Sequence, residues 1–306
     1  MPPPNDRRAI PVYLLFTLGL SSIFYLLNAK SSTGGGEWVD YIGWLMWCPA
    51  IGALLTCKYL GRSVSTLGWK WGKTRYEVAG YLIPLGYTSL IYIFVWTTGL
   101  GGFYNKAFVN LVAKDFGFGP PPPWATISIY FFFTATIGVI RDCATVLGEE
   151  IGWRGFLVPE LAKRHSFFAT ALISGIIWAL WHYPLLLLGT YHSATPVWYY
   201  LPLFTITVTS INFLWAWLRL KSGSIWPGVF LHAAHNTFFQ RFFDPLTVFN
   251  ARTSYVATEF GVALTVVSIL MAFYFWRRRG EVEGYILPDS LAVQYSHPPQ
   301  TARPAQ

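Results

Sequence analysis

A few polar side chains lie inside long apolar stretches of this sequence. A charge at the centre of a bilayer costs about 2.5 to 3.5 kcal/mol on insertion scales, so a membrane helix keeps one only where it is paired or faces a cavity. The side chains in question are Glu149, Glu150, Arg154, His182, His232 and Asn236. Their types are those of an acid–base site, so each is a candidate functional residue.

The first group is two acids and an arginine in the run LGEEIGWRG. Glu150 and Arg154 are four positions apart and share a helix face, so they can form an ion pair. Glu149 lies about 100° around the helix from Glu150 and has no basic residue three or four positions away. We therefore expect Glu149 to do the chemistry. The alternative is that the segment ends a membrane span and both acids lie among the lipid headgroups.

The other two groups carry imidazole and amide nitrogens. His182 follows Trp178 by one helical turn on the same face, although a lone buried histidine is more often structural. In the run HAAHN, His232 and Asn236 are four apart and share a face, while His235 lies about 50° off that line. His232 and Asn236 can therefore direct two nitrogen atoms at one spot.

Depth along the helices connects the three groups. Counted from the basic turn 163–165, Glu149 and His182 both lie roughly 21 to 22 Å along their helices, at 1.5 Å per residue. Counted from the start of their own helix, His232 and Asn236 lie roughly 12 and 18 Å in. Three helices are therefore predicted to place these four side chains in one polar layer inside the membrane.

This layer has the groups that amide hydrolysis needs. Glu149 and His182 facing one cavity can deprotonate a water molecule. His232 and Asn236 can donate to the oxyanion that forms when a peptide carbonyl is attacked, a contribution typically worth about 10² to 10³ in rate. The sequence has neither a G-x-S-x-G elbow nor an H-E-x-x-H motif, so water is the preferred nucleophile.

The same side chains leave a metal-dependent version open. We predict no cofactor, but a glutamate and two histidines can also bind Zn²⁺ with water in an open position. The ligands would then be Glu149, His182 and His232.

Composition indicates which elements hold these residues. The chain is 54% hydrophobic and only 12% charged, whereas soluble domains carry about 25% charged residues. The short period of alternation that a transmembrane barrel requires does not repeat. We predict an all-α, polytopic transmembrane helix bundle with about eight spans, at about 10–28, 41–58, 78–100, 127–162, 167–188, 198–218, 225–241 and 256–276.

Charge predicts the orientation of the bundle. The positive charges lie in short clusters between apolar segments rather than on one basic face, which argues against a nucleic-acid partner. Alternate connections are basic, so the positive-inside rule places both termini in the cytoplasm, as an even number of spans requires. Residues 1–280 are expected to form a single transmembrane catalytic domain, and residues 281–306 a disordered cytoplasmic tail.

The three groups together resemble the CAAX-processing and bacteriocin-processing endopeptidase family, known as CPBP, which includes the Ras-converting prenyl-protein proteases. The hallmarks of that family are E-E-x-x-x-R, F-x-x-x-H and H-x-x-x-N. This chain has EEIGWR at 149–154, WALWH at 178–182 and HAAHN at 232–236. Trp153 and Trp178 stand where the family usually has Phe. The resemblance covers roughly residues 134–239.

The resemblance implies a glutamate-dependent, metal-free intramembrane endopeptidase. Its first Glu and second-motif His would activate water, its third-motif His and Asn would form the oxyanion hole, and the remaining motif residues would support the site. These roles fall on Glu149 and His182, on His232 and Asn236, and on Glu150, Arg154 and Trp178.

The expected partners are the lipid bilayer and a membrane-anchored peptide or protein substrate, for which the family suggests a prenylated CAAX sequence. The expected location is a bacterial inner membrane, or the endoplasmic reticulum membrane of a eukaryote, with the active site open to the cytoplasm. The alternative is a non-enzymatic membrane protein. It would be a bacteriocin-immunity-like scaffold or a proton-coupled carrier, since intramembrane ionisable residues also serve transport.

Overall fold

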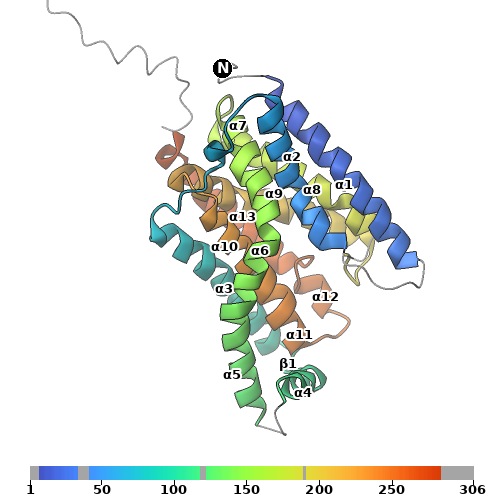
Figure 1. Cartoon of the computed structure of the whole chain (residues 1–306). Helices are drawn as coiled ribbons and strands as arrows, with labels where there is room; N and C mark the ends of the chain where they lie inside the picture. Colours follow the sequence, from blue (N-terminus) through green and yellow to red (C-terminus); the bar gives the residue numbers. More distant parts are fainter. Residues whose placement is uncertain (1–6, 34–40, 118–121, 189–190, 284–306) are drawn as a thin grey trace, which may run out of the picture.

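Long helices dominate the part of the chain that the structure, a computed structural model, describes: residues 7–33, 41–117, 122–188 and 191–283. The longer helices are α1 (Ala9–Thr33), α2 (Tyr41–Tyr59), α3 (Thr74–Thr97), α5 (Pro123–Phe133), α6 (Val139–Glu150), α8 (Phe167–Leu188), α9 (Val197–Ser222), α10 (Trp226–Asn236) and α13 (Val262–Arg277). The shorter α-helices are α4 (Lys106–Asp115), α7 (Val158–Ala162), α11 (Asp244–Leu246) and α12 (Thr253–Val256). Their arrangement is the elongated bundle of Figure 1.

Other secondary structure is sparse. Two short 3₁₀ turns are η1 (Val64–Leu67) and η5 (Arg279–Glu281). The two-residue strands β1 (Gly102–Phe103) and β2 (Thr247–Val248) pair antiparallel and join the loop after α3 to the loop after α11. The prediction of a helical class is therefore confirmed, with this small sheet as an addition that the sequence did not indicate.

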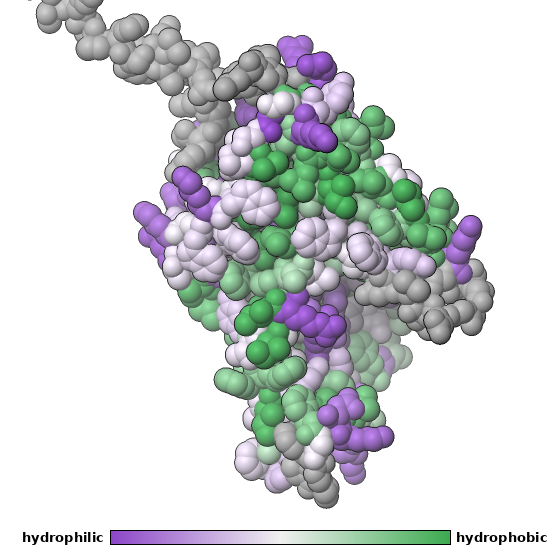
Figure 2. Space-filling model, viewed as in Figure 1, coloured by the Kyte–Doolittle hydropathy of each residue, from purple (hydrophilic) through white to green (hydrophobic). Residues whose placement is uncertain are grey.

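Several helices are suited to a membrane. Among the described residues, five helical stretches are long and apolar enough to cross it: Ala9–Lys30, Thr74–Thr97, Pro123–Ala162, Phe167–Leu188 and Val197–Ser222. Helices also occupy the other three predicted positions, as α2, α10 and α13, but they do not meet the same criteria of length and hydropathy. Apolar side chains cover much of the face shown in Figure 2, and hydrophilic ones gather in a few clusters. The count of about eight spans is thus not confirmed.

The basic connections gather at one end of the bundle. Arg62 Nη1 lies 2.9 Å from Glu160 Oε1, which also pairs with Lys163. Ile225 N donates to Gly68 O at 3.0 Å, which joins the connection before α10 to the connection before α3. The first residues of α1 and the last residues of α13 lie at this same, upper end in Figure 1. Segments far apart in sequence thus share one charged end.

The predicted span at 127–162 is a continuous helix of 40 residues, Pro123–Ala162. Two π-helical segments interrupt its α-helical pattern, η2 (Thr134–Gly138) and η3 (Ile151–Leu157). A third, η4 (Thr237–Phe243), directly follows α10. Wider turns of this kind often occur at functional sites. Two of the three begin immediately after a predicted motif pair, namely after Glu150 and after Asn236.

Small residues let α2 approach the long helix closely. A Cβ atom on Gly152 would lie 2.4 Å from Pro49 Cβ, and one on Gly148 would lie 2.5 Å from Met46 O. These two glycines are four positions apart and so face α2 together. Small residues at this spacing are common where membrane helices pack. They hold α6 in place at the turn that carries Glu149.

The predicted boundary at residue 280 falls inside the described chain. Val282 is buried, and η5 packs at the end of α13. Residues 284–306 of the predicted tail lie outside the described residues, so the single domain and its tail stay predictions.

Candidate functional site

Three helices bring the predicted site residues together. α6 carries Glu149 and Glu150, α8 carries His182, and α10 carries His232 and Asn236. α6 packs against α10, and η3, the π-helical continuation of α6, packs against α8. The polar groups of three separate sequence motifs therefore meet in the interior of the bundle.

Glu150 lies at the centre of a buried charged network. Its Oε1 lies 3.0 Å from Arg154 Nη1 and 2.9 Å from His232 Nδ1. Arg154 Nη2 donates to Asn212 Oδ1 at 3.1 Å, and the guanidinium lies 4.0 Å from the centre of the Trp178 ring. A buried ion pair persists only with good geometry and added hydrogen bonds, and this pair has both, although Glu150 Oε2 and Arg154 Nε find no hydrogen-bond partner among the described residues. The predicted pairing of Glu150 with Arg154 is confirmed.

Glu149 is held by indole groups instead of a cation. Its Oε2 accepts a hydrogen bond of 2.7 Å from Trp178 Nε1 and one of 3.3 Å from Trp153 Nε1. Only 2% of Glu149 is exposed. Both donors bind Oε2, so they hold the carboxylate in place. Oε1 receives neither of these two hydrogen bonds. Trp153 and Trp178, the two tryptophans that stand in place of Phe in the predicted motifs, therefore both contact this carboxylate.

The orientation of His182 is set by its own helix. Its Nδ1 lies 2.8 Å from the carbonyl oxygen of Trp178. A carbonyl only accepts, so Nδ1 carries the proton and Nε2 of the neutral ring is an acceptor. The ring also packs edge-on against Trp181 and Phe204. His182 therefore has the tautomer that a general base requires.

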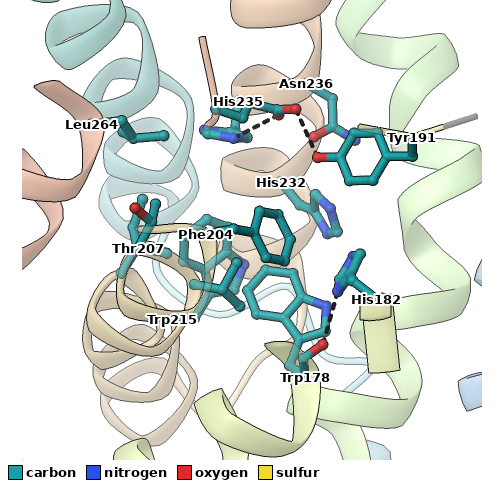
Figure 3. Close-up of a pocket in the computed structure, with 13 residues that line it drawn as sticks. Trp178, His182, Tyr191, Phe204, Thr207, Trp215, His232, His235, Asn236 and Leu264 are labelled. Carbon is teal, nitrogen blue, oxygen red and sulfur yellow. Dashed lines mark hydrogen bonds and ion pairs between the residues drawn. The ribbon is translucent and has the colours of Figure 1, made fainter. Parts of the chain in front are cut away.

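A small cavity connects these groups. Its volume is about 50 Å³, which is enough for ordered water. In Figure 3, His182 and His232 lie near one another beside the Trp178 ring, with Asn236 beyond His232. Glu149 does not line the cavity itself and is joined to its wall by the hydrogen bond from Trp178 to Oε2. Three of the four predicted residues, His182, His232 and Asn236, thus line one water-sized space.

The opposite wall of this cavity carries a second acid that sequence reasoning missed. Glu259 is 6% exposed and lines the cavity with His235. Its Oε1 lies 3.0 Å from His235 Nε2, its Oε2 accepts from Tyr191 at 2.8 Å, and Gln240 Nε2 lies 3.0 Å from both oxygens. His235 Nδ1 in turn lies 2.6 Å from the hydroxyl of Tyr87. A second carboxylate–histidine pair therefore borders the site.

A signal for Glu259 was present in the sequence. It is an acid near the start of the predicted apolar span 256–276. An acid within an apolar stretch is also the feature that identified Glu149 as a candidate. Its partners, however, lie 19 to 68 positions away along the chain. Helical spacing links only residues three or four apart, so it could not connect Glu259 with His235.

The geometry does not favour the metal ligands considered from the sequence. Across the described part of the chain, no three His, Cys, Asp or Glu side chains are grouped closely enough to hold a metal ion. As they are placed in the described part of the chain, Glu149, His182 and His232 are thus not close enough together to act as the three zinc ligands considered from the sequence.

Comparison with known proteins matches the region that holds the motifs. Residues 122–238 match the model of a family described as "Type II CAAX prenyl endopeptidase Rce1-like". A relative named "CAAX prenyl protease 2", from Methanococcus maripaludis, is 32% identical over 78 residues, which is 24% of this chain and 28% of the relative. The resemblance drawn from the three motifs is confirmed over this region. Together with the apolar helices, it identifies an integral membrane protein.

Proposed function

We propose that the protein is an intramembrane endopeptidase that hydrolyses a peptide bond of a membrane-associated substrate. The observation that carries this proposal is the cavity of about 50 Å³ around which His182, His232 and Asn236 lie, with Glu149 hydrogen-bonded behind Trp178. The match of residues 122–238 to a protease family supports the same reaction class.

In the proposed reaction, a water molecule in the cavity is the nucleophile. His182 Nε2 is the acceptor nitrogen of its ring, because Nδ1 is bonded to the Trp178 carbonyl. Glu149 keeps its carboxylate plane fixed through Trp178 and Trp153. These two bases take the proton of the water as its oxygen attacks the peptide carbonyl. When the C–N bond breaks, the same proton passes to the leaving amine.

The oxyanion formed in that attack needs donors. His232 Nδ1 bonds to Glu150, which leaves Nε2 for the cavity, and the donor role proposed for His232 requires a proton on that nitrogen. Asn236 contributes an amide N–H from the next turn of α10. Next to His232, Glu150 also pairs with Arg154 at 3.0 Å, and good geometry of this kind limits the cost of a buried ion pair.

Glu259 acts in this proposal as a positioning residue for Asn236. It bonds to His235 and to Gln240, which flank Asn236 on either side of the junction between α10 and η4. A change from α-helical to π-helical turns at this point alters where the Asn236 amide is directed. By holding both sides of the junction, Glu259 keeps that amide towards the oxyanion.

The orientation of the bundle in the membrane is proposed from the position of its basic end. The basic end of the bundle faces the cytoplasm, both termini lie there, and about eight spans cross the membrane. The site opens to the cytoplasm in a bacterial inner membrane. The substrate class is a prenylated CAAX-type protein, supported by the family description and by the name of the relative.

A cleavage assay tests the function directly. Purified protein in detergent is incubated with membrane-anchored peptides that carry or lack a prenyl group. Wild type should cleave, and Glu149→Gln or His182→Ala should lower kcat by at least about 100-fold, as loss of a general base typically does. Asp115→Asn and His192→Ala, which change exposed residues, should cleave like wild type. Wild type without activity on any peptide would favour the scaffold or carrier. Full activity of both site variants would instead overturn the roles proposed for Glu149 and His182.

A chelation experiment distinguishes the metal-free mechanism from the zinc-dependent one. We expect activity to persist after dialysis against a strong chelator, because no three His, Cys, Asp or Glu side chains of the described residues are grouped closely enough to hold a metal ion. The measurement is kcat before and after chelation, with metal content checked by mass spectrometry. Loss of activity that returns with Zn²⁺ would show that the site rearranges around a metal.

A further inference from the structure

A second cavity lies at the basic end of the bundle, away from the candidate active site. It has a volume of about 560 Å³ and opens between the start of α3 and the ends of α9 and α13. Arg75, Lys221 and Arg278 line it, one from each of these regions, and Glu281 is beside them. We call this cavity the basic groove.

Positive charge in the basic groove exceeds negative charge. Arg278 bonds to both carboxylate oxygens of Glu281, at 2.6 and 3.1 Å, and Lys221 Nζ lies 3.3 Å from Glu281 Oε2. Arg278 also lowers the pKa of Glu281, so this acid is ionised at neutral pH. Arg75 donates to the neutral hydroxyl of Tyr76. Three cations thus share one acid, and the groove carries a net charge of about +2 at neutral pH.

Apart from the hydroxyls of Tyr76 and Tyr274, the rest of the lining is apolar, and part of it runs along α3. Arg75, Ala79 and Ile83 are spaced four apart, so they form one face of α3 that runs about 12 Å from the charged end towards the bundle centre. The buried rings of Trp217 and Phe275 form the floor. The groove therefore has a cationic end and an apolar end, as a site for an amphiphile requires.

We propose that the basic groove binds an anionic phospholipid, with the headgroup phosphate between Arg75 and Lys221 and an acyl chain along Ala79 and Ile83. Basic pockets between membrane helices are suited to such headgroups. The apolar half of the groove favours a lipid over a free anion. The inference concerns binding alone and does not depend on the proposed protease activity.

A neighbouring cavity serves as an internal comparison. It lies at the same end and has a volume of about 600 Å³, with Arg62 and Lys163 in its lining. Both of these cations pair with the single acid Glu160, which leaves a net charge of about +1. Anionic lipid should therefore prefer the basic groove, and Arg62→Gln is a matched control for charge removal at the same end of the bundle.

Lipid retention measured by native mass spectrometry tests the proposal. The full chain in an uncharged detergent is incubated with phosphatidylglycerol, with phosphatidylcholine or with inorganic phosphate. We expect phosphatidylglycerol to be retained preferentially. Arg75→Gln and Lys221→Gln should each weaken its binding about fivefold, and together about 25-fold, since one cation near a membrane surface contributes about that factor. Arg62→Gln should leave this site unchanged.

A second variant tests the site without changing its charge. Ala79→Trp places a large ring in the groove from α3 and should expel the lipid, while thermal unfolding in lipid-free detergent shows that the chain remains folded. Equal retention of both lipids, or binding unaffected by Arg75→Gln with Lys221→Gln, would overturn the proposal. Inorganic phosphate that displaces the lipid at equal concentration would also overturn it, because the groove would then be a site for a free anion.

Discussion

At the scale of the residue, three polar side chains of the candidate site have partners that decide which of their atoms remain for the chemistry. Nδ1 of His182 donates to a backbone carbonyl, and Nδ1 of His232 bonds to Glu150. Oε2 of Glu149 accepts two indole N–H groups. Buried hydrogen bonds of this kind restrict the orientation of the side chains that make them. Removing such a partner should therefore change activity, because the site side chain that it orients is no longer held in place.

Glu259→Gln should show this effect. The change keeps the shape of the side chain but removes the charge that holds His235 and Gln240. We expect kcat to fall by up to about 100-fold with KM nearly unchanged, because a small misplacement of a donor has this cost. Steady-state kinetics on the cleaved peptide provide the measurement.

A double-mutant cycle distinguishes positioning from general damage. If Glu259 acts through Asn236, then Glu259→Gln should have little further effect in an Asn236→Ala background. Full additivity of the two changes would contradict the positioning role, while cleavage by wild type and its loss in Asn236→Ala would leave the proposed function standing. Rescue by Glu259→Asp would not be expected from a side chain that only fills space.

At the scale of the element, helix packing and π-helical turns place these residues. α2 contacts α6 and η3 at Gly148 and Gly152, where a side chain has no room. The wide turns of η3 and η4 begin directly after Glu150 and Asn236. A π-helical turn shifts the helical face of every residue that follows it. The positions of Arg154 and Gln240 relative to the cavity therefore depend on these turns.

Gly152→Ala tests the close packing. The added Cβ would lie 2.4 Å from Pro49 Cβ, so we expect the free energy of unfolding to fall by about 1 to 3 kcal/mol, the usual cost of overpacking. Thermal unfolding in detergent gives the direction of the change. Gly86→Ala, which meets no atom within 4 Å on α3, is the control. Equal stability of the two variants would show that α2 can move away from η3 without cost.

At the scale of the whole molecule, several basic connections lie at the same end of the bundle. The connections around Arg62, Lys163, Lys221 and Arg278 meet at one end. α8 runs from that end to the other, and α9 returns. The segment 191–196 between them therefore belongs to the opposite end. The structure brings the basic segments together, and the positive-inside rule then predicts which side they face.

Labelling of single cysteines tests that orientation. In a background with Cys48, Cys57 and Cys143 changed to alanine, Ser65→Cys and Ala194→Cys introduce thiols at exposed positions of opposite ends. In intact cells, a membrane-impermeant maleimide should label the variant at 194 and spare the one at 65. In inverted vesicles the pattern should reverse. Labelling of both from the same side would contradict the predicted topology.

The sequence by itself determined the features that depend on near neighbours in the chain. Apolar length predicted helices, and spacing of four predicted the Glu150–Arg154 pair, which the structure has at 3.0 Å. The same reasoning placed His232 and Asn236 on one face, and both line the cavity. These predictions succeed because residues four apart stay close to one helix face over a single turn, even where, as at Arg154, the next turn is π-helical.

Only the tertiary structure decided which distant groups meet. It joined Glu150 to His232 across 82 positions and brought Glu259 to the site through Tyr191, 68 positions away. It also formed the basic groove from three helix ends. Such contacts depend on how helices pack, on glycines that allow close approach and on π-helical turns that change the face of a helix. None of these has a fixed spacing in the sequence, so the polar layer was predictable while its hydrogen-bond partners were not.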